Sequence, residues 1–176
     1  MFAIRVPFVD AAGHSDPVPT HRYRYEPTNI TLLHGIFAIV VDDERDARHA
    51  MQRLLERWGC LVLGAAGADE ALSMLAQHDR VPELVICDYH LAAGDNGVVA
   101  IRRIQALFEC VVPAILVTAN ASPDVLRAGK VHHIPILRKP VAPAKLRALL
   151  HELLTHARRD HGEGATRGPP ATFHHS

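Results

Sequence analysis

The chain has 176 residues, 48% of them hydrophobic, which is enough to bury one sizeable core and predicts a single domain with additional terminal segments. Its 19 lysine and arginine residues equal its 19 aspartate and glutamate residues, so no net charge attracts nucleic acid or an anionic membrane, and neither is expected as a partner. The sequence shows no signal-peptide pattern and no apolar stretch long enough to cross a bilayer, so we expect a cytoplasmic protein.

The two ends of the chain lack a periodic apolar pattern. Residues 10–35 begin with a stretch rich in proline, glycine, histidine, serine, threonine and tyrosine, and are interpreted as a linker. Residues 157–176 are similarly unpatterned and are predicted to be a disordered tail. The folded unit is therefore predicted to span residues 36–156.

Within this unit, four segments are almost wholly apolar rather than alternating between apolar and polar residues. Such runs are typical of parallel strands that are buried on both faces of a sheet. The four runs are residues 36–41, 84–87, 114–117 and 134–137, and the shorter run 61–63 is predicted to supply a fifth strand.

Five helices are predicted between and after the strands, because apolar residues recur there at spacings of three and four. Gly59 ends the first helix, and Asp69 and Glu70 lie in the first turn of the second, where a helix dipole favours acidic residues. The third is predicted over residues 98–108 and the fourth from Ser122 to Gly129. The last begins at Pro143 and is expected to bury four leucines, namely Leu146, Leu149, Leu150 and Leu153.

Alternation of five strands with five helices predicts an α/β fold. Right-handed crossovers then favour a doubly wound, flavodoxin-like parallel sheet with strand order 2-1-3-4-5. In such a sheet, ligands bind at the carboxyl ends of the strands.

Polar residues follow four of the predicted strands at that edge. They are Asp42 with Asp43, then Asp88, Thr118 and Lys139. Three neighbouring carboxylates repel one another unless a cation lies among them, and Mg²⁺ prefers oxygen ligands of this kind. A carboxylate can also act as a nucleophile and form an aspartyl phosphate, while a metal, a lysine and a hydroxyl group neutralise the charge of a phosphoryl group. The sequence therefore predicts phosphoryl chemistry at this edge.

These segments resemble the receiver domains of two-component response regulators. The matching motifs are VVDDE at residues 40–44, VICDY at 85–89, LVTA at 116–119 and LRKP at 137–140, in the family's order. The resemblance covers residues 36–156.

The resemblance implies a role for each carboxylate. Asp88 would be the phosphoryl acceptor and a ligand of Mg²⁺, Asp43 would bind the metal directly, and Asp42 would bind it through water. The backbone carbonyl of His90 would be the third protein ligand of the metal.

The resemblance also implies roles for two residues that are not acidic. Thr118 would donate its hydroxyl to the phosphoryl group, and Lys139 would pair with that group as a cation. The peptide bond between Lys139 and Pro140 is usually cis in this family, a form that proline makes accessible.

Two features depart from the most common pattern of the family. Ile136 stands where many receivers have a tyrosine or phenylalanine, so a switch based on aromatic rotation is not expected. The loop of residues 91–97 lacks the usual proline and looks like the loop of receivers that are fused to sensor kinases.

Residues 1–9 allow two interpretations. They look like the closing strand of a histidine-kinase ATPase domain, in which case the chain resembles the C-terminal piece of a hybrid histidine kinase. They could equally be a short apolar strand with no such origin. In both cases the nucleotide-binding motifs of that domain are absent from the sequence, so we expect neither ATP binding nor phosphorylation of a histidine.

Three cysteines, Cys60, Cys87 and Cys110, lie in or beside apolar segments and lack CxxC spacing. We expect them to be small buried side chains in a reducing compartment rather than disulfides or metal ligands.

The predicted function is that of a phosphorelay receiver. It would accept a phosphoryl group from a histidine kinase or a histidine phosphotransfer protein and pass it on or report it through protein contacts. No separate catalytic activity is expected beyond magnesium-dependent phosphorylation and dephosphorylation of Asp88. The sequence leaves open whether two copies form a homodimer.

Two alternatives remain at this stage. One is a receiver-shaped docking module that is never phosphorylated, although the presence of both Asp88 and Lys139 argues against it. The other is a cobalamin-binding domain, because Asp88-Tyr89-His90 is followed by Gly94, one position later than the cobalamin motif requires.

Overall fold

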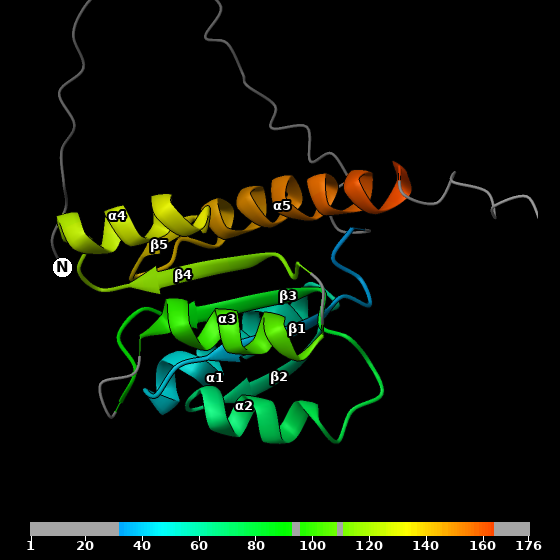
Figure 1. Cartoon of the computed structure of the whole chain (residues 1–176), viewed down its shortest axis with the longest axis horizontal. Coiled ribbons are helices and arrows are strands. Elements are labelled where there is room, and N and C mark those ends of the chain that lie inside the picture. The colour runs from blue at the N-terminus through cyan, green and yellow to red at the C-terminus, as the bar shows by residue number, and fades with distance from the viewer. Residues whose placement is uncertain (1–31, 93–95, 109–110, 164–176) are drawn as a thin grey trace, which may run out of the picture.

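The computed structural model describes residues 32–92, 96–108 and 111–163. Five parallel strands form one sheet with the order β2-β1-β3-β4-β5, as predicted (Figure 1). The strands are β1 (Phe37–Val41), β2 (Leu61–Ala65), β3 (Leu84–Asp88), β4 (Ala114–Thr118) and β5 (Ile136–Arg138). Every residue of β1, β3 and β4 is buried, which explains why these strands are apolar apart from Asp88 and Thr118 at the ends of β3 and β4.

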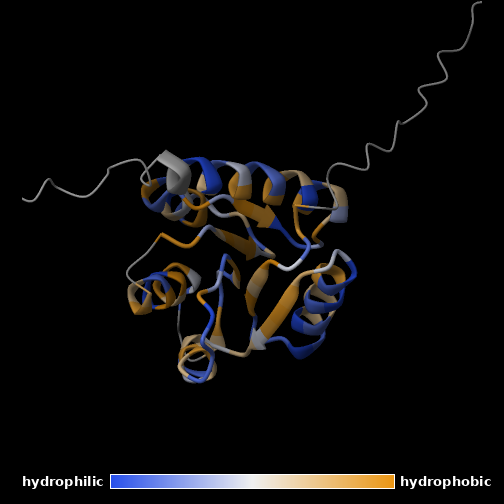
Figure 2. Ribbon diagram, turned by 90° about the vertical axis from the view of Figure 1, so that its right-hand side faces the viewer, coloured by the Kyte–Doolittle hydropathy of each residue, from blue (hydrophilic) through white to orange (hydrophobic). Residues whose placement is uncertain are grey.

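Helices cover both faces of the sheet, and their apolar residues turn toward it (Figure 2). They are α1 (Arg45–Arg57), α2 (Ala68–Leu75), α3 (Gly97–Leu107), α4 (Pro123–His132) and α5 (Pro143–Glu163). Helices α2 and α3 pack with one face of β1, including Ile39 and Val41, whereas α1 and α5 pack with the other, including Ala38 and Val40. Side chains that alternate along the strands thus build two separate apolar layers.

The folded unit is larger than the sequence predicted at both ends. The predicted linker was wrong for its last residues, because Leu33 is only 2% exposed and packs with Ile36 in the layer beneath α5. The boundary at His156 was also wrong, because α5 continues to Glu163. The last part of α5 is polar, so the sequence shows no periodic signal of a helix there. A helix that runs beyond the core has no apolar stripe. Residues 1–31 and 164–176 of the predicted terminal segments lie outside the described residues.

Helix α4 also extends further than predicted, from Gly129 to His132. The chain leaves the helix at His133, whose φ of 54° is left-handed and whose N–H donates to the Lys130 carbonyl at 3.3 Å. A side chain at residue 129 would be crowded, because a Cβ there would lie 2.9 Å from the backbone carbonyl oxygen of Ile134 and 2.5 Å from Cδ1 of Ile136. The isoleucine at the aromatic position of the family thus packs directly over α4.

In α5, the predicted burial of Leu146 and Leu150 is confirmed, whereas Leu149 and Leu153 are half-buried at the edge of the layer. Leu154 is also buried, which the sequence analysis missed. Among the residues that the structure describes, no helix combines the length and the apolar character needed to cross a membrane.

The burial of Leu33 can be tested by mutation. Leu33→Ala should lower the free energy of unfolding by about 2–5 kcal/mol, because it removes a buried side chain and leaves a cavity. The matched control is Leu126→Ala, since Leu126 is 45% exposed in α4, and its effect should be within about 0.5 kcal/mol. Urea unfolding followed by circular dichroism measures both. Equal losses in the free energy of unfolding of the two variants would show that Leu33 belongs to the linker and not to the core.

Candidate functional site

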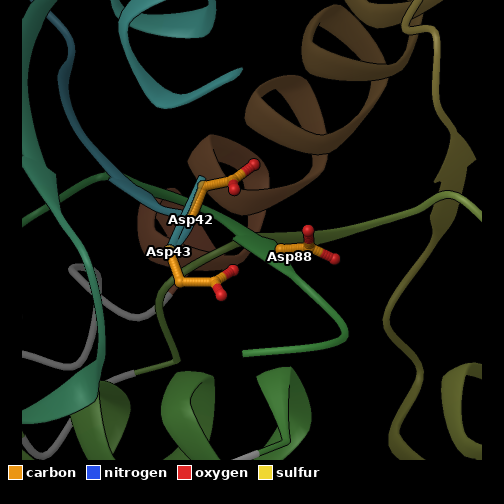
Figure 3. Close-up of side chains that lie close together, drawn as sticks. All are labelled: Asp42, Asp43 and Asp88. Atoms are coloured by element: carbon orange, nitrogen blue, oxygen red, sulfur yellow. The ribbon is translucent and has the colours of Figure 1, made fainter. Parts of the chain in front are cut away.

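The polar residues predicted from the strand ends meet at the carboxyl edge of the sheet. Asp42 and Asp43 follow β1, and Asp88 is the last residue of β3. One carboxylate oxygen from each of these aspartates lies within 4.8 Å of the others, and Figure 3 shows the three side chains around a common space. Parallel pairing of β1 with β3 in register produces this arrangement, because Val41 lies opposite Cys87.

Lys139 joins two of these carboxylates. Its Nζ lies 2.8 Å from Oδ2 of Asp42 and 2.5 Å from Oδ2 of Asp88. Partial burial alone would lower the pKa of Lys139, but hydrogen bonds to the two carboxylates and their charges outweigh burial and raise the pKa above its usual value. The lysine therefore remains a cation at neutral pH.

The remaining carboxylate oxygens of Asp42 and Asp88 accept backbone hydrogen bonds. Oδ1 of Asp42 accepts from the N–H of Glu44 at 3.0 Å, and Oδ1 of Asp88 accepts from the N–H of His90 at 3.1 Å. These bonds compensate for burial, since Asp42 is 6% and Asp88 9% exposed. Asp43 differs in that its side chain is exposed at the mouth of the site.

Thr118 is fully buried at the end of β4, and its hydroxyl is engaged within its own loop. Oγ1 donates to the backbone carbonyl of Asn120 at 3.0 Å and lies 3.3 Å from the N–H of the same residue. The backbone carbonyl of Thr118 accepts from the N–H of Lys139 at 2.8 Å, which ties the two strand ends together. The peptide bond between Lys139 and Pro140 is cis, as the resemblance implied.

The donor set fits a magnesium ion. Asp42, Asp43 and Asp88 each offer a carboxylate oxygen within a small space, and Mg²⁺ prefers oxygen ligands together with several waters. Asp43 is open to solvent, so a hydrated ion can reach it. His90, whose carbonyl is the expected third ligand, lies two residues after Asp88 at the edge of the same site.

The sequence analysis missed two residues that shape the site. The guanidinium of Arg48 in α1 donates to the backbone carbonyl of Asp42 at 2.5 Å, which fixes the turn that carries the first two aspartates. Asn120 holds the hydroxyl of Thr118 through its main chain. Arg48 falls on the polar face of its helix, and a main-chain contact leaves no residue pattern, so the sequence held no signal for either.

An apolar pocket of about 290 Å³ adjoins the acidic group. Ala47, Met51 and Leu54 of α1 form one wall, and Pro140 and Val141 form the other. Asp42, Asp88 and Lys139 also line this pocket, so the phosphoryl-acceptor candidate borders an apolar surface.

The cysteines occupy core positions, as predicted for Cys60 and Cys87, which are both buried. Burial, with a smaller effect from the charge of Glu83, raises the pKa of Cys60 to about 11, so its thiol is neutral and unreactive at neutral pH. Cys87 packs in the layer of α2 and α3, away from the layer that α1 and α5 cover. Cys110 lies outside the described residues.

Comparison with known proteins decides the family. The family model described as "Response regulator receiver domain" matches residues 38–151. The chain belongs to this family. Because the chain belongs to the receiver family, its assignment to a family of cobalamin-binding domains is excluded.

Two curated relatives are much longer than the chain. It is 31% identical over 149 residues to the sensory/regulatory protein RpfC of Xanthomonas campestris pv. campestris, an alignment that covers 82% of this chain and 19% of RpfC. It is 33% identical over 123 residues to the transcriptional regulatory protein ZraR of Escherichia coli O157:H7, covering 69% of this chain and 27% of ZraR. The chain thus spans about a fifth to a quarter of the length of these relatives.

Solved structures agree on the fold. The chemotaxis protein CheY4 of Vibrio cholerae has a TM-score of 0.59 at 22% identity, over 68% of this chain and 98% of CheY4. A CheY-like receiver domain protein from Methanospirillum hungatei has a TM-score of 0.63 at 23% identity, over 72% and 98% of the two chains.

The pairing of Lys139 predicts a difference in alkaline stability. Because the pKa of Lys139 is raised in the folded state, its contribution to stability is complete below the unfolded value of about 10.4 and is lost as pH rises through the folded value. In the Lys139→Ala variant, this loss of stability at alkaline pH should be absent. Without metal at pH 7, it should also cost about 1–3 kcal/mol, since two buried carboxylates lose a donor.

Urea unfolding of wild type and variant between pH 8 and pH 11.5 measures the effect. Lys145→Ala, which removes an exposed lysine of α5, serves as the control and should keep the wild-type pH dependence. A Lys139→Ala variant with the same alkaline profile as wild type would contradict the pairing.

Proposed function

We propose that Asp88 accepts a phosphoryl group from a phosphohistidine of a partner protein and forms an aspartyl phosphate. The observation that carries this proposal is the pairing of a buried Asp88 carboxylate with Lys139 at 2.5 Å, with Asp42 and Asp43 beside it. The site thus holds a carboxylate that can attack phosphorus, a fixed cation and further carboxylates that can bind a metal. The cation and the metal would stabilise the charge of the phosphoryl group during transfer.

The proposed transfer is a displacement reaction at phosphorus. A carboxylate oxygen of Asp88 forms a bond to phosphorus while the bond between phosphorus and the imidazole nitrogen breaks. The electron pair of that bond returns to the imidazole nitrogen of the partner. When bound, Mg²⁺ would neutralise charge on the phosphoryl oxygens, with Asp43, Asp88 and the His90 carbonyl as direct ligands and Asp42 as a ligand through water.

Lys139 and Thr118 have separate tasks in this proposal. Lys139 moves its charge from Asp88 to a phosphoryl oxygen, so the same cation stabilises the carboxylate before transfer and the phosphate after it. Thr118 can donate to a phosphoryl oxygen only after its hydroxyl leaves the Asn120 carbonyl. Phosphorylation would therefore reposition the loop that leads into α4, and then α4 and β5, without an aromatic switch.

The proposed partner is a histidine kinase or a histidine phosphotransfer protein. The apolar pocket between α1 and residues 140–141 borders Asp88, so a partner helix that covers it would bring its histidine to the acceptor and exclude water.

We place this exchange in the cytoplasm, where ATP supplies the phosphohistidine. The similarity to RpfC supports an origin within a hybrid kinase, and no catalytic activity is proposed beyond reactions at Asp88. Whether two copies form a homodimer can be tested by measuring the molecular mass of the protein in solution at the concentration used in the assays.

Intact mass spectrometry after incubation with acetyl phosphate tests the proposal. Wild type with Mg²⁺ should gain one phosphoryl group, and both omission of Mg²⁺ and the substitution Asp88→Asn should prevent it. Asp69→Asn, in which an exposed aspartate of α2 is changed, is the matched control and should be phosphorylated like wild type. A folded wild-type protein without the adduct would favour the docking module that is never phosphorylated.

A further inference from the structure

Asn96 closes the segment that leads from the acceptor Asp88 to helix α3. Its side-chain Oδ1 accepts from the N–H of Val98 at 2.8 Å, and its Nδ2 donates to the hydroxyl of Tyr89 at 3.3 Å. Its main chain forms an isolated antiparallel bridge with His90. One residue therefore contacts the start of α3 and both residues that follow Asp88.

The start of α3 also lies directly against the acceptor. The N–H of Gly97 donates to the backbone carbonyl of Tyr89 at 2.9 Å, and a Cβ at residue 97 would lie 2.2 Å from the backbone carbonyl oxygen of Asp88. This close approach leaves little room for α3 to shift without moving β3. The position of Asn96 is thus rigidly related to the peptide groups of residues 88–90.

Those peptide groups perform two tasks at the site. The N–H of His90 donates to Oδ1 of Asp88 at 3.1 Å and so orients the acceptor carboxylate. The carbonyl of His90 is one of the three direct metal ligands in the proposed function. Any rotation of the His90 backbone would therefore disturb both the acceptor and the metal site.

We propose that Asn96 is a positioning residue for the metal site, acting through Tyr89 and His90. The proposal rests on the function proposed above, since it concerns the ligand that His90 offers to Mg²⁺. The hydrogen bond between Asn96 and Tyr89 fixes the direction of the segment after Asp88, as residues behind a metal ligand commonly fix its orientation.

A simple helix cap is the competing explanation, because asparagine is a favoured residue at this position. Two substitutions separate the roles. Asn96→Ser keeps a capping oxygen for Val98 but loses the donor to Tyr89. Tyr89→Phe removes the same bond from the other side and leaves the cap intact.

The experiment measures two quantities by NMR for wild type, each single variant and the double variant. One is the Mg²⁺ dissociation constant from amide shifts, and the other is the hydrogen-exchange rate of the His90 amide without metal. Each single variant should bind Mg²⁺ about tenfold more weakly and exchange the His90 amide faster. The double variant should be no worse than either single variant, because both remove one bond.

Ser122→Ala is the matched control, since Ser122 accepts from the N–H of Val125 and so caps α4 instead of α3. It should leave both measurements unchanged. Wild-type affinity and wild-type His90 exchange in Asn96→Ser and Tyr89→Phe would overturn the proposal. If wild type itself fails to bind Mg²⁺, the proposed function fails, but His90 exchange still decides whether Asn96 positions the segment.

Discussion

The ion pairs of Lys139 with Asp42 and Asp88 are the interaction on which the site depends. They join residues that are 97 and 51 positions apart in the chain, so only the folded sheet can form them. Parallel strands in the order 2-1-3-4-5 place the ends of β1 and β3 side by side, with β4 and β5 next to them. Buried carboxylates are tolerable there because a cation and backbone N–H groups compensate them, and the same compensation favours a phosphoryl group.

The sequence predicted the sheet well because β1, β3 and β4 are buried on both faces and are therefore apolar up to the polar residues that end β3 and β4. It also predicted that Asp42, Asp88 and Lys139 lie at one edge of the sheet, where the structure pairs them, since the carboxyl ends of parallel strands share that edge. The boundaries were less accurate. Leu33 lies in a turn of four residues, where a buried side chain gives no periodic signal of the kind that a helix or strand gives. The end of α5 carries no apolar stripe.

Contacts made by the main chain could not be predicted from residue types. The hydroxyl of Thr118 is bound by the backbone of Asn120, and the turn after β1 is fixed by a bond from Arg48 to a backbone carbonyl. Such contacts depend on where loops lie in space. They nevertheless bear on the proposed function, in which Thr118 would exchange the Asn120 carbonyl for a phosphoryl oxygen before α4 responds. The close approach of Ile136 to Gly129 is the contact through which β5 and α4 would move together in that proposal.

A crystal structure of the protein with Mg²⁺ and beryllofluoride, which mimics an aspartyl phosphate, would show directly whether Asp88 is the acceptor. We expect beryllium bonded to a carboxylate oxygen of Asp88 and the metal on Asp43, Asp88 and the His90 carbonyl. We also expect Nζ of Lys139 and the hydroxyl of Thr118 to contact the fluorine atoms. Beryllofluoride at another residue, or an unchanged pairing of Lys139 with Asp88, would contradict the proposed function.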